Sequence, residues 1–312
     1  MSLNRRASMV AVLSGSIFAL TSSLFAQVPI GDPAHEFGLL VMAHGGGAVW
    51  NREVETMLAP LRHDYVLEIA FGMADAVSLQ EAVHKLEAQG VRRIGVVRLF
   101  ISGESWYQRT EQILGLRPGA PARPREDAHA GHGDHAGHSM AFWQMDTNAA
   151  FALSAQGLAE APEMGAVLVE RAQALSRDPH RESVLLIAHG PQNDAEDQTW
   201  LAQIGTRAEA VRQAAPFRRV QVETLREDWP EKRAASEARI RAFVEHATRE
   251  GGVAIVIPYR IQGFGPYAEV LEGLSYVSDG RALLPSAQVE HWVRRQAAEL
   301  RAGSFRAPER AR

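Results

Sequence analysis

The chain has no cysteine and only a small excess of charge of one sign. Among its 312 residues the absence of cysteine excludes disulfides, thiolate nucleophiles and thiolate metal sites, so any metal ligand must be nitrogen or oxygen. The formal net charge is -4, from 33 basic and 37 acidic residues. That balance gives no electrostatic reason to bind a phosphate backbone, and we expect no nucleic acid partner.

The rest of the composition is that of an ordinary soluble globular protein. Hydrophobic residues make up 46% of the chain and charged residues 22%, which excludes wholesale disorder and a multi-span membrane protein. A chain of this length predicts two domains, or one domain with a large insertion.

Residues 1–26 have the layout of a secretory signal peptide. Arg5 and Arg6 precede a mostly apolar stretch at 9–20, and Ala26 ends a run of small and apolar residues. The stretch is interrupted and shorter than the roughly 20 residues that a spanning helix needs, although a permanent anchor is the alternative. We therefore predict cleavage after Ala26, export to the periplasm and no membrane span in the mature chain.

Strand-like and helix-like segments alternate along the chain, and the alternation occurs twice. Apolar runs at 39–43, 65–71 and 94–97 are separated by segments of helical period, and the pattern restarts with runs at 184–188, 220–224 and 253–257. Strands that alternate with single helices indicate right-handed crossovers and parallel sheets covered on both faces. The predicted fold is α/β, with two tandem doubly wound halves of the flavodoxin or Rossmann kind.

The two halves form an internal repeat. The segments LLVMAHG (39–45) and VLLIAHG (184–190) match, and Glu68 and Glu223 are matched as the ends of the second strands. Matched positions lie 160 residues apart at the third strands and 125 apart at the fourth, so the first half carries 35 extra residues between them. We predict a first domain at 38–175 with an insertion at about 117–145, a second domain at 183–300, a flexible tail at 301–312 and a monomeric pseudo-dimer.

Candidate catalytic and metal-binding residues directly follow the first strand or end the second strand of each half: His44, Glu68, His189 and Glu223. The glycines that follow the two histidines are candidates for ligand binding: Gly45, Gly46 and Gly190. Because the carboxyl ends of parallel strands form the ligand crevice, these groups are expected at one cleft. An imidazole with a carboxylate suits a divalent metal and also proton abstraction. Buried structural histidines and strand-edge or helix-capping glutamates are the alternative.

A second candidate metal site is the histidine-rich tract DAHAGHGDHAGHS at 127–139. Its histidines recur at every third position: His129, His132, His135 and His138. Neutral imidazole is a good ligand for zinc, nickel, cobalt or copper, and the intervening glycines and alanines let the rings converge. We predict metal capture by this tract, with an inert solvated loop as the alternative. Because the tract follows the third helix, we expect it to join the fold at the edge opposite the cleft.

Three segments resemble the CbiX-type sirohydrochlorin chelatases. They are the strand-His-Gly opening, AFGMADAVSLQEAV at 70–83 and RRIGVVRLFISG at 92–103, within a resemblance that covers residues 38–300. The resemblance implies a class II chelatase fold, in which two fused halves insert cobalt or ferrous iron into a tetrapyrrole held in the central cleft. It also implies that the histidine after the first strand and the glutamate of the second strand bind the metal.

The chain departs from this family at the third metal ligand, a histidine after the third strand. Trp106 and Pro266 stand in that region of the two halves, and Glu104 and Tyr107 are candidate substitutes. Two hypotheses follow: a lyase-type metal chelatase acting on a sirohydrochlorin-like tetrapyrrole, or an exported non-catalytic protein that sequesters or delivers a divalent ion. Both imply a divalent transition metal (cobalt, iron, nickel or zinc) and no nucleotide cofactor.

Overall fold

The computed structural model describes residues 36–124 and 140–309. The predicted signal peptide and the tract 127–139 lie outside the described residues. Within the described ranges, no helix combines the length and the apolar character that a membrane-spanning segment requires.

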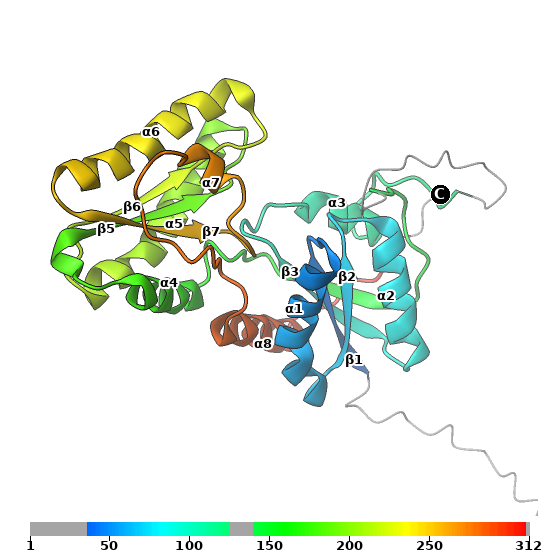
Figure 1. The fold of residues 1–312 in the computed structure, drawn as a ribbon. Coiled ribbons are helices and arrows are strands. Elements are labelled where there is room, and N and C mark those ends of the chain that lie inside the picture. Colours follow the sequence, from blue (N-terminus) through cyan, green and yellow to red (C-terminus); the bar gives the residue numbers. More distant parts are fainter. Residues whose placement is uncertain (1–35, 125–139, 310–312) are drawn as a thin grey trace, which may run out of the picture. The chain divides into compact units, whose positions relative to one another are not determined.

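The first half contains a four-stranded parallel sheet in the order β2-β1-β3-β4. Its strands are β1 (Phe37–Ala43), β2 (Val66–Phe71), β3 (Arg93–Leu99) and β4 (Ala150–Leu153). The helices between them are α1 (Ala48–Leu58), the 3-10 helix η1 (Ala59–His63), α2 (Ala76–Ala88) and α3 (Tyr107–Ile113) (Figure 1).

The second half repeats this order in a three-stranded parallel sheet, β6-β5-β7. The elements are η2 (Pro179–Arg181), β5 (Glu182–Ala188), α5 (Asp194–Ala214), β6 (Arg219–Thr224), α6 (Pro230–Arg249), β7 (Val253–Tyr259) and α7 (Tyr267–Val270). Val277 pairs in parallel with Ile255 of β7, at the place that β4 takes in the first sheet. The predicted α/β fold with two parallel-sheet halves is confirmed.

The central strands and the helix starts follow from local sequence. β1 and β5 are buried along all seven residues, as the central strands of sheets covered on both faces are expected to be. The Asp75 side chain accepts the amide of Ser78 and begins α2, and the Asn193 side chain accepts the amides of Ala195 and Glu196 and begins α5. Both are ordinary N-cap contacts that replace missing intrahelical partners.

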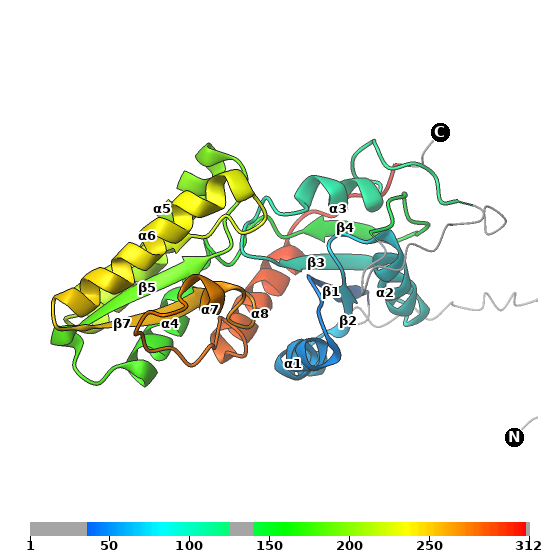
Figure 2. The same cartoon turned by 45° about the horizontal axis from the view of Figure 1, so that its top comes forward.

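The last helix of each half packs on the other half. The helix α4 (Glu163–Leu175) follows β4 but contacts β7 and α5, whereas α8 (Ala287–Ala302) follows the second sheet but contacts β3, β4 and α1. Figure 1 and Figure 2 both show α4 beside the second sheet and α8 beside the first. The sequence halves are therefore not separate packing units.

One apolar cluster extends through both sheets because of this exchange. It contains Leu39 and Val41 of β1, Leu186 of β5 and the fully buried Trp292 of α8. The Trp292 indole Nε1 donates to Gln156 Oε1 at 2.9 Å, so the polar end of this large side chain is satisfied. Separate clusters cover the outer faces, under α2 and α3 in the first half and under α6 and α7 in the second.

Residues 303–309, predicted as part of a flexible tail, are instead held against β4 and α3. Arg306 pairs with Phe151 of β4 in an antiparallel bridge, and its guanidinium donates to Glu111 Oε1 at 2.7 Å. Burial alone would raise the pKa of Glu111, but hydrogen bonds from Arg306 and Arg117 hold it below its usual value. Arg306 of this segment forms an ion pair with Glu111 of α3, a contact that the sequence alone does not reveal.

Candidate functional site

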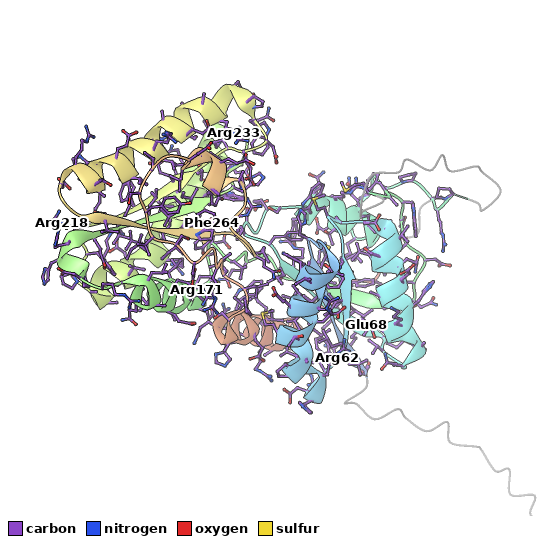
Figure 3. The ribbon with its side chains drawn as sticks, viewed as in Figure 1. Arg62, Glu68, Arg171, Arg218, Arg233 and Phe264 are labelled. Carbon is purple, nitrogen blue, oxygen red and sulfur yellow. The ribbon has the colours of Figure 1, made fainter. Side chains whose placement is uncertain are left out.

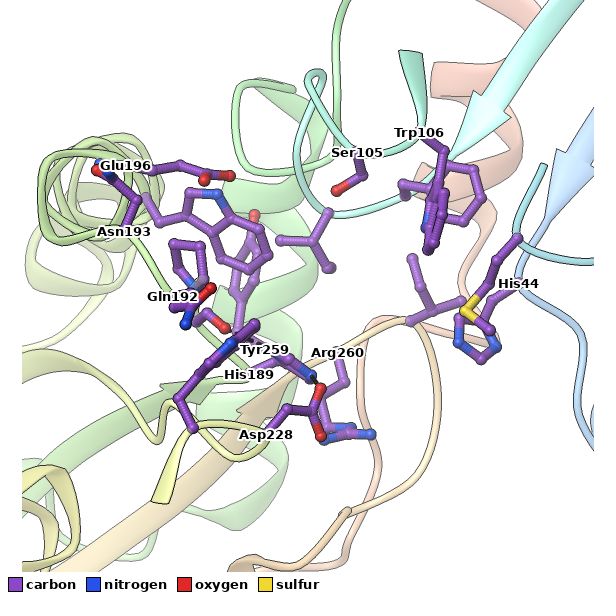
Figure 4. Close-up of a pocket in the computed structure, with 18 of the residues that line it drawn as sticks. His44, Ser105, Trp106, His189, Gln192, Asn193, Glu196, Asp228, Tyr259 and Arg260 are labelled. Carbon is purple, nitrogen blue, oxygen red and sulfur yellow. Dashed lines mark hydrogen bonds and ion pairs between the residues drawn. The ribbon is translucent and has the colours of Figure 1, made fainter. Parts of the chain in front are cut away.

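A cavity of about 850 Å³ lies at the carboxyl ends of the parallel strands. Every strand except β4 contributes a lining residue, either from its carboxyl end or from the segment that follows it. In chain order these include His44, Met73, Phe100, His189, Asp228 and Arg260. Open α/β sheets bind their ligands at this edge. Figure 4 shows residues of the two halves facing each other across the cavity.

The two predicted histidines line this same cavity. His44 directly follows β1 and His189 directly follows β5, and Figure 4 shows them on opposite sides. The two rings share one local geometry: Nδ1 of His44 lies 2.8 Å from the carbonyl oxygen of Gly45, and Nδ1 of His189 lies 2.7 Å from that of Gly190. The structure thus brings together the imidazoles of both halves.

The glycines after the histidines turn the backbone. Gly45 and Gly190 have φ angles of 79° and 80°, a left-handed conformation that favours glycine. A Cβ on Gly190 would lie 2.6 Å from Cβ of Thr224, so this position also requires the absence of a side chain. Gly190 lines the cavity, whereas Gly45 and Gly46 are not among the lining residues. The His-Gly pattern is explained by chain geometry in both halves.

The structure does not bring Glu68 to the cavity. Glu68 is the third residue of β2, pairs with Leu40 of β1, and does not end its strand. Its neighbours on the same face, Val66 and Ala70, pack in the cluster under α2. Glu68 therefore lies on the α2 face of the first sheet, as Figure 3 shows, and is absent from the cavity lining.

Glu223 also lies away from the cavity. It pairs with Ile187 of β5 and accepts a hydrogen bond at 3.0 Å from Nε of Arg239 on α6. The counterpart of Ile187 in β1 is Met42, which pairs with Ala70, so Glu223 corresponds to Ala70 rather than to Glu68. The predicted match of the two glutamates was wrong by two residues, because a shift of two residues leaves every side chain on the same face of the sheet and so fits the same alternating pattern.

Two carboxylates that the sequence analysis missed do reach His189. In the loop between β6 and α6, Asp228 Oδ2 lies 2.8 Å and Glu227 Oε1 lies 3.3 Å from His189 Nε2. Trp229, the next residue, packs edge-on against the imidazole at 5.7 Å between ring centroids. The available signal was their position, immediately after a strand on the ligand edge of the sheet.

Arg260 is the cation that faces this group. Its Nη1 donates to Glu227 Oε1 at 2.6 Å, and its guanidinium lies over the ring of Tyr267. Burial alone would lower the pKa of Arg260, but Tyr267 and Glu227 raise it above its ordinary value. The site thus contains a permanently charged guanidinium, in contact with a carboxylate that is 10% exposed.

Four tryptophans line the cavity, two from each half: Trp50, Trp106, Trp200 and Trp229. Trp200 is also part of the apolar core, as are the two tryptophans that do not line the cavity, Trp143 and Trp292. Large aromatic faces around a cavity suit a flat apolar ligand.

Arg98 organises the loop that follows β3. It is 1% exposed, and its side chain donates to the carbonyl oxygens of Ser154 at 3.0 Å and Ser105 at 2.7 Å. Burial lowers the pKa of Arg98 to about 10, which still leaves it charged at neutral pH. These contacts hold Ser105 and Trp106 at the cavity.

The two candidate substitutes for the missing histidine do not reach the cavity. The ring of Tyr107 lies 4.5 Å from the Arg98 guanidinium, and Glu104 is exposed. Neither residue lines the cavity. Within the described part of the chain, no group of three or more histidine, aspartate or glutamate side chains is arranged to hold a metal ion.

The chain that leaves the histidine-rich tract joins the fold beside the cavity. The Ala141 amide donates to Asp75 Oδ1 at 2.7 Å, and its carbonyl accepts the Ala76 amide at 3.0 Å. Met73, two residues before Asp75, lines the cavity. The expectation that the tract joins at the opposite edge was therefore wrong at its carboxyl end. The four histidines themselves lie outside the described residues.

No protein-family model matches the chain, and no curated protein matches its sequence. Solved structures do match. The chain is similar to SirB from Bacillus subtilis with Fe3+, with a TM-score of 0.60 at 13% identity, over 86% of this chain and 96% of that one. It is also similar to the sirohydrochlorin chelatase SirB from Bacillus subtilis subspecies spizizenii in complex with cobalt, with a TM-score of 0.52 at 12% identity, over 86% and 99%.

A third structure is a multi-domain protein from Deinococcus radiodurans with structural similarity to chelatases. Its TM-score is 0.51 at 18% identity, and the matched region covers 86% of this chain but only 57% of that one. Together with the two parallel sheets, these similarities define the class: the chain has a two-half fold of the class II chelatase kind.

Proposed function

We propose that the protein binds a tetrapyrrole in the cavity between the two sheets and acts on it as a chelatase, with His44 and His189 holding the divalent ion that is inserted. The observation that supports this proposal most directly is that both histidines line one cavity of about 850 Å³ together with four tryptophans. A cavity of this size is in the range of small-molecule and cofactor sites.

The similarity to SirB supports this proposal. The two SirB structures contain Fe3+ and cobalt, and this chain shares their fold over most of their length. We extend the proposal to a CbiX-type activity, with cobalt or iron as the metal substrate and a sirohydrochlorin-like tetrapyrrole as the acceptor. Residues 1–26 would direct this activity to the periplasm.

Each residue group has a role in this proposal. The imidazoles bind the ion through nitrogen, a borderline ligand that releases its metal readily compared with thiolate. The tryptophans hold the macrocycle in one plane, which fixes its nitrogens relative to the ion. Insertion replaces two pyrrole N–H protons by the metal, and the Asp228 and Glu227 carboxylates are the acceptors nearest to His189. Glu68 and Glu223 have no part in it.

The second candidate is an exported, non-catalytic protein that binds or delivers a divalent ion. It is favoured by the positions of Glu68 and Glu223 outside the cavity and by the absence of a third-strand histidine. Such a protein would bind the ion in the same cavity without transferring it to a macrocycle.

Insertion assays distinguish the two candidates. Sirohydrochlorin with Co(II) or Fe(II) is incubated with and without the protein, and the metallated product is followed by absorbance. We expect insertion faster than the uncatalysed rate, a loss of at least about tenfold in His44→Ala/His189→Ala, and no change in the control His246→Ala on α6. Stoichiometric metal binding without insertion would support the second candidate, and absence of both would contradict both.

A further inference from the structure

Resting on the proposed tetrapyrrole site, we infer that Arg98 is a positioning residue for the macrocycle. It fixes the loop between β3 and α3, and through that loop it sets Trp106 as an aromatic surface on which the ring lies. Trp106 lines the cavity, whereas Arg98 does not. Figure 4 shows Trp106 and His44 on the same side of the cavity, opposite His189. This role leaves the proposed acceptor, a sirohydrochlorin-like tetrapyrrole, unchanged.

The backbone at Trp106 is strained. Its φ angle is 59°, in the left-handed region that a bulky side chain rarely occupies. Strain of this kind persists only where surrounding contacts maintain it, and it is concentrated at functional sites. The loop after β7 shows the ordinary solution in the second half, because its left-handed positions are Gly263 and Gly265. A tryptophan at such a position therefore needs a reason other than turning the chain, and a place in the cavity wall provides one.

The side chain of Arg98 holds this loop in its strained conformation. Each nitrogen of its guanidinium donates to a different carbonyl oxygen: Nε to Ser154 at 3.0 Å, Nη1 to Ser105 at 2.7 Å and Nη2 to Gly103. The carbonyl of Ser105 belongs to the residue directly before Trp106. The guanidinium also lies 4.5 Å from the ring centroid of Tyr107, the residue directly after Trp106. One side chain thus contacts the neighbours of Trp106 on both sides.

The fold itself does not require a cation at this position. Arg98 pairs with Met42 of β1, and Pro258 pairs in the same way with Ile187, the counterpart of Met42 in β5. Pro258 thus takes the place of Arg98 in the second half, where the same strand order forms without a buried guanidinium. Arg98 is 1% exposed, and its hydrogen bonds must offset the free energy lost when a charge leaves water. A buried arginine in only one half points to a role in the cavity wall of that half.

A fixed indole affects metal insertion as well as binding. A flat aromatic face on the cavity wall suits stacking against a tetrapyrrole. A ring held against such a face presents its nitrogens to the ion in one orientation, and insertion depends on that orientation. A loop released from Arg98 would let the ring tilt. Loss of the guanidinium should therefore weaken binding and also slow insertion at saturating tetrapyrrole.

A second buried arginine provides a matched control. Arg171 on α4 is also 1% exposed and also donates to backbone carbonyl oxygens, those of Ala282 and Pro285. None of these three residues lines the cavity. Arg98→Met and Arg171→Met each remove a guanidinium and keep an unbranched side chain, so both should lower stability. Only Arg98→Met should change how the ring is held.

Spectroscopy of bound sirohydrochlorin measures that difference. The mature chain and both variants are titrated with the tetrapyrrole, and its absorbance gives Kd while circular dichroism in its visible bands reports its orientation in the protein. We expect Arg98→Met to raise Kd by at least about threefold, to alter the induced dichroism and to slow cobalt insertion at saturating tetrapyrrole. Arg171→Met should change none of these. Equal results for the two variants would overturn the inference while leaving the proposed function intact.

Tryptophan and tyrosine variants extend the test. Trp106→Leu should raise Kd by about five- to tenfold, and the matched Trp143→Leu, at a core tryptophan outside the cavity, should not. If Arg98→Met does not fold, Tyr107→Leu removes the ring beside the guanidinium instead and should shift the induced dichroism in the same direction as Trp106→Leu. Unchanged dichroism in Tyr107→Leu would then count against the inference. If the unchanged chain does not bind sirohydrochlorin, the proposed function fails, and the role of Arg98 fails with it.

Discussion

The loop that carries Asp228 to His189 depends on a single buried arginine. Arg226 is 5% exposed, has a left-handed φ of 57°, and pairs with the buried Asp197 at 3.1 Å between Nη1 and Oδ2. It also donates to the carbonyl oxygen of Gln192, in the loop that follows β5. The two loops on either side of His189 are thereby fixed to each other, and their arrangement rests on individual residues rather than on helices or strands.

The first prediction concerns Gly190. In Gly190→Ala, the positive φ and the contact of a new Cβ with Thr224 should lower the free energy of unfolding by about 2–4 kcal/mol. Urea denaturation followed by circular dichroism measures the change. The control is Gly205→Ala, in the interior of α5 with open space around it, which should raise stability by about 0.5–1 kcal/mol. Equal effects of the two changes would contradict the role given to Gly190.

A second prediction concerns the pH dependence of Glu182, at the junction of the two halves. Burial alone would raise its pKa, but hydrogen bonds from the Ser176 side chain and the amides of Arg177 and Asp178 hold it below its usual value. A lowered folded-state pKa stabilises the protein above the unfolded value of about 4.3, and that contribution disappears as pH falls through the folded value. Glu182→Gln should therefore lower the free energy of unfolding by about 1–3 kcal/mol at pH 7, and by progressively less below about pH 4.

Denaturation curves of the Glu182→Gln variant and the unchanged chain between pH 3 and 7 measure this difference. The exposed Glu55 on α1 provides the matched control, because Glu55→Gln should shift stability by less than about 0.5 kcal/mol across the range. A cost for Glu182→Gln that grows toward acid pH would contradict the assignment.

At the scale of elements, the exchange of α4 and α8 decides which surfaces become core. Arg171 on α4 is 1% exposed and donates to the carbonyl oxygens of Ala282 and Pro285, in the segment that leads into α8. Arg295 on α8 donates to Glu163 of α4 at 2.7 Å. The two exchanged helices are therefore joined to each other as well as to the sheets.

A third prediction follows for Trp292 on α8. Trp292→Ala removes a fully buried side chain from the shared cluster and should lower the free energy of unfolding by about 3–5 kcal/mol. Because the cluster joins both sheets, unfolding should remain a single transition, with the midpoint of both halves lowered together. Calorimetry measures the number of unfolding transitions and their midpoints, and the control is Val77→Ala, at an exposed position on α2. Loss of the first half alone would contradict a shared core.

The elements that local pattern determines were predictable, and those that depend on tertiary partners were not. The apolar runs before His44 and His189 identify β1 and β5 and place both imidazoles at the ligand edge. The register of β6, which separates Glu223 from Glu68, is set by pairing with β5 rather than by its own sequence. The exchange of α4 and α8 leaves no sequence signal, because each helix carries an apolar face whichever sheet it covers.

At the scale of the whole molecule, we propose separable roles for the described part of the chain and for the histidine-rich tract. Residues 36–124 and 140–309 form the sheets and the cavity, and the tract is an insertion between β3 and β4. The amide of Ala141, two residues after the tract, donates to Asp75, so the chain enters the described fold near the cavity at this point. Its metal capture remains our proposal.

A fourth prediction therefore concerns deletion of residues 127–139. The shortened chain should bind fewer divalent ions, because four imidazoles are lost, while its unfolding midpoint changes little. Equilibrium dialysis with cobalt, nickel or zinc measures the stoichiometry. The control replaces the four histidines by glutamine at unchanged length, and it should lose the same number of ions. An unchanged stoichiometry would identify the tract as a linker.

Because α4 and α8 each cover the sheet of the other half, a half-length version of this protein would be incomplete. A polypeptide that ended after α4 would keep a sheet with one bare side and a terminal helix with nothing of its own to cover. Two such polypeptides would bury both surfaces by exchanging their terminal helices across a twofold axis. The resulting homodimer would have the same arrangement as the single chain. The single chain then corresponds to such a dimer with its two subunits joined covalently. Once joined, the two halves can differ in sequence on the two sides of one cavity.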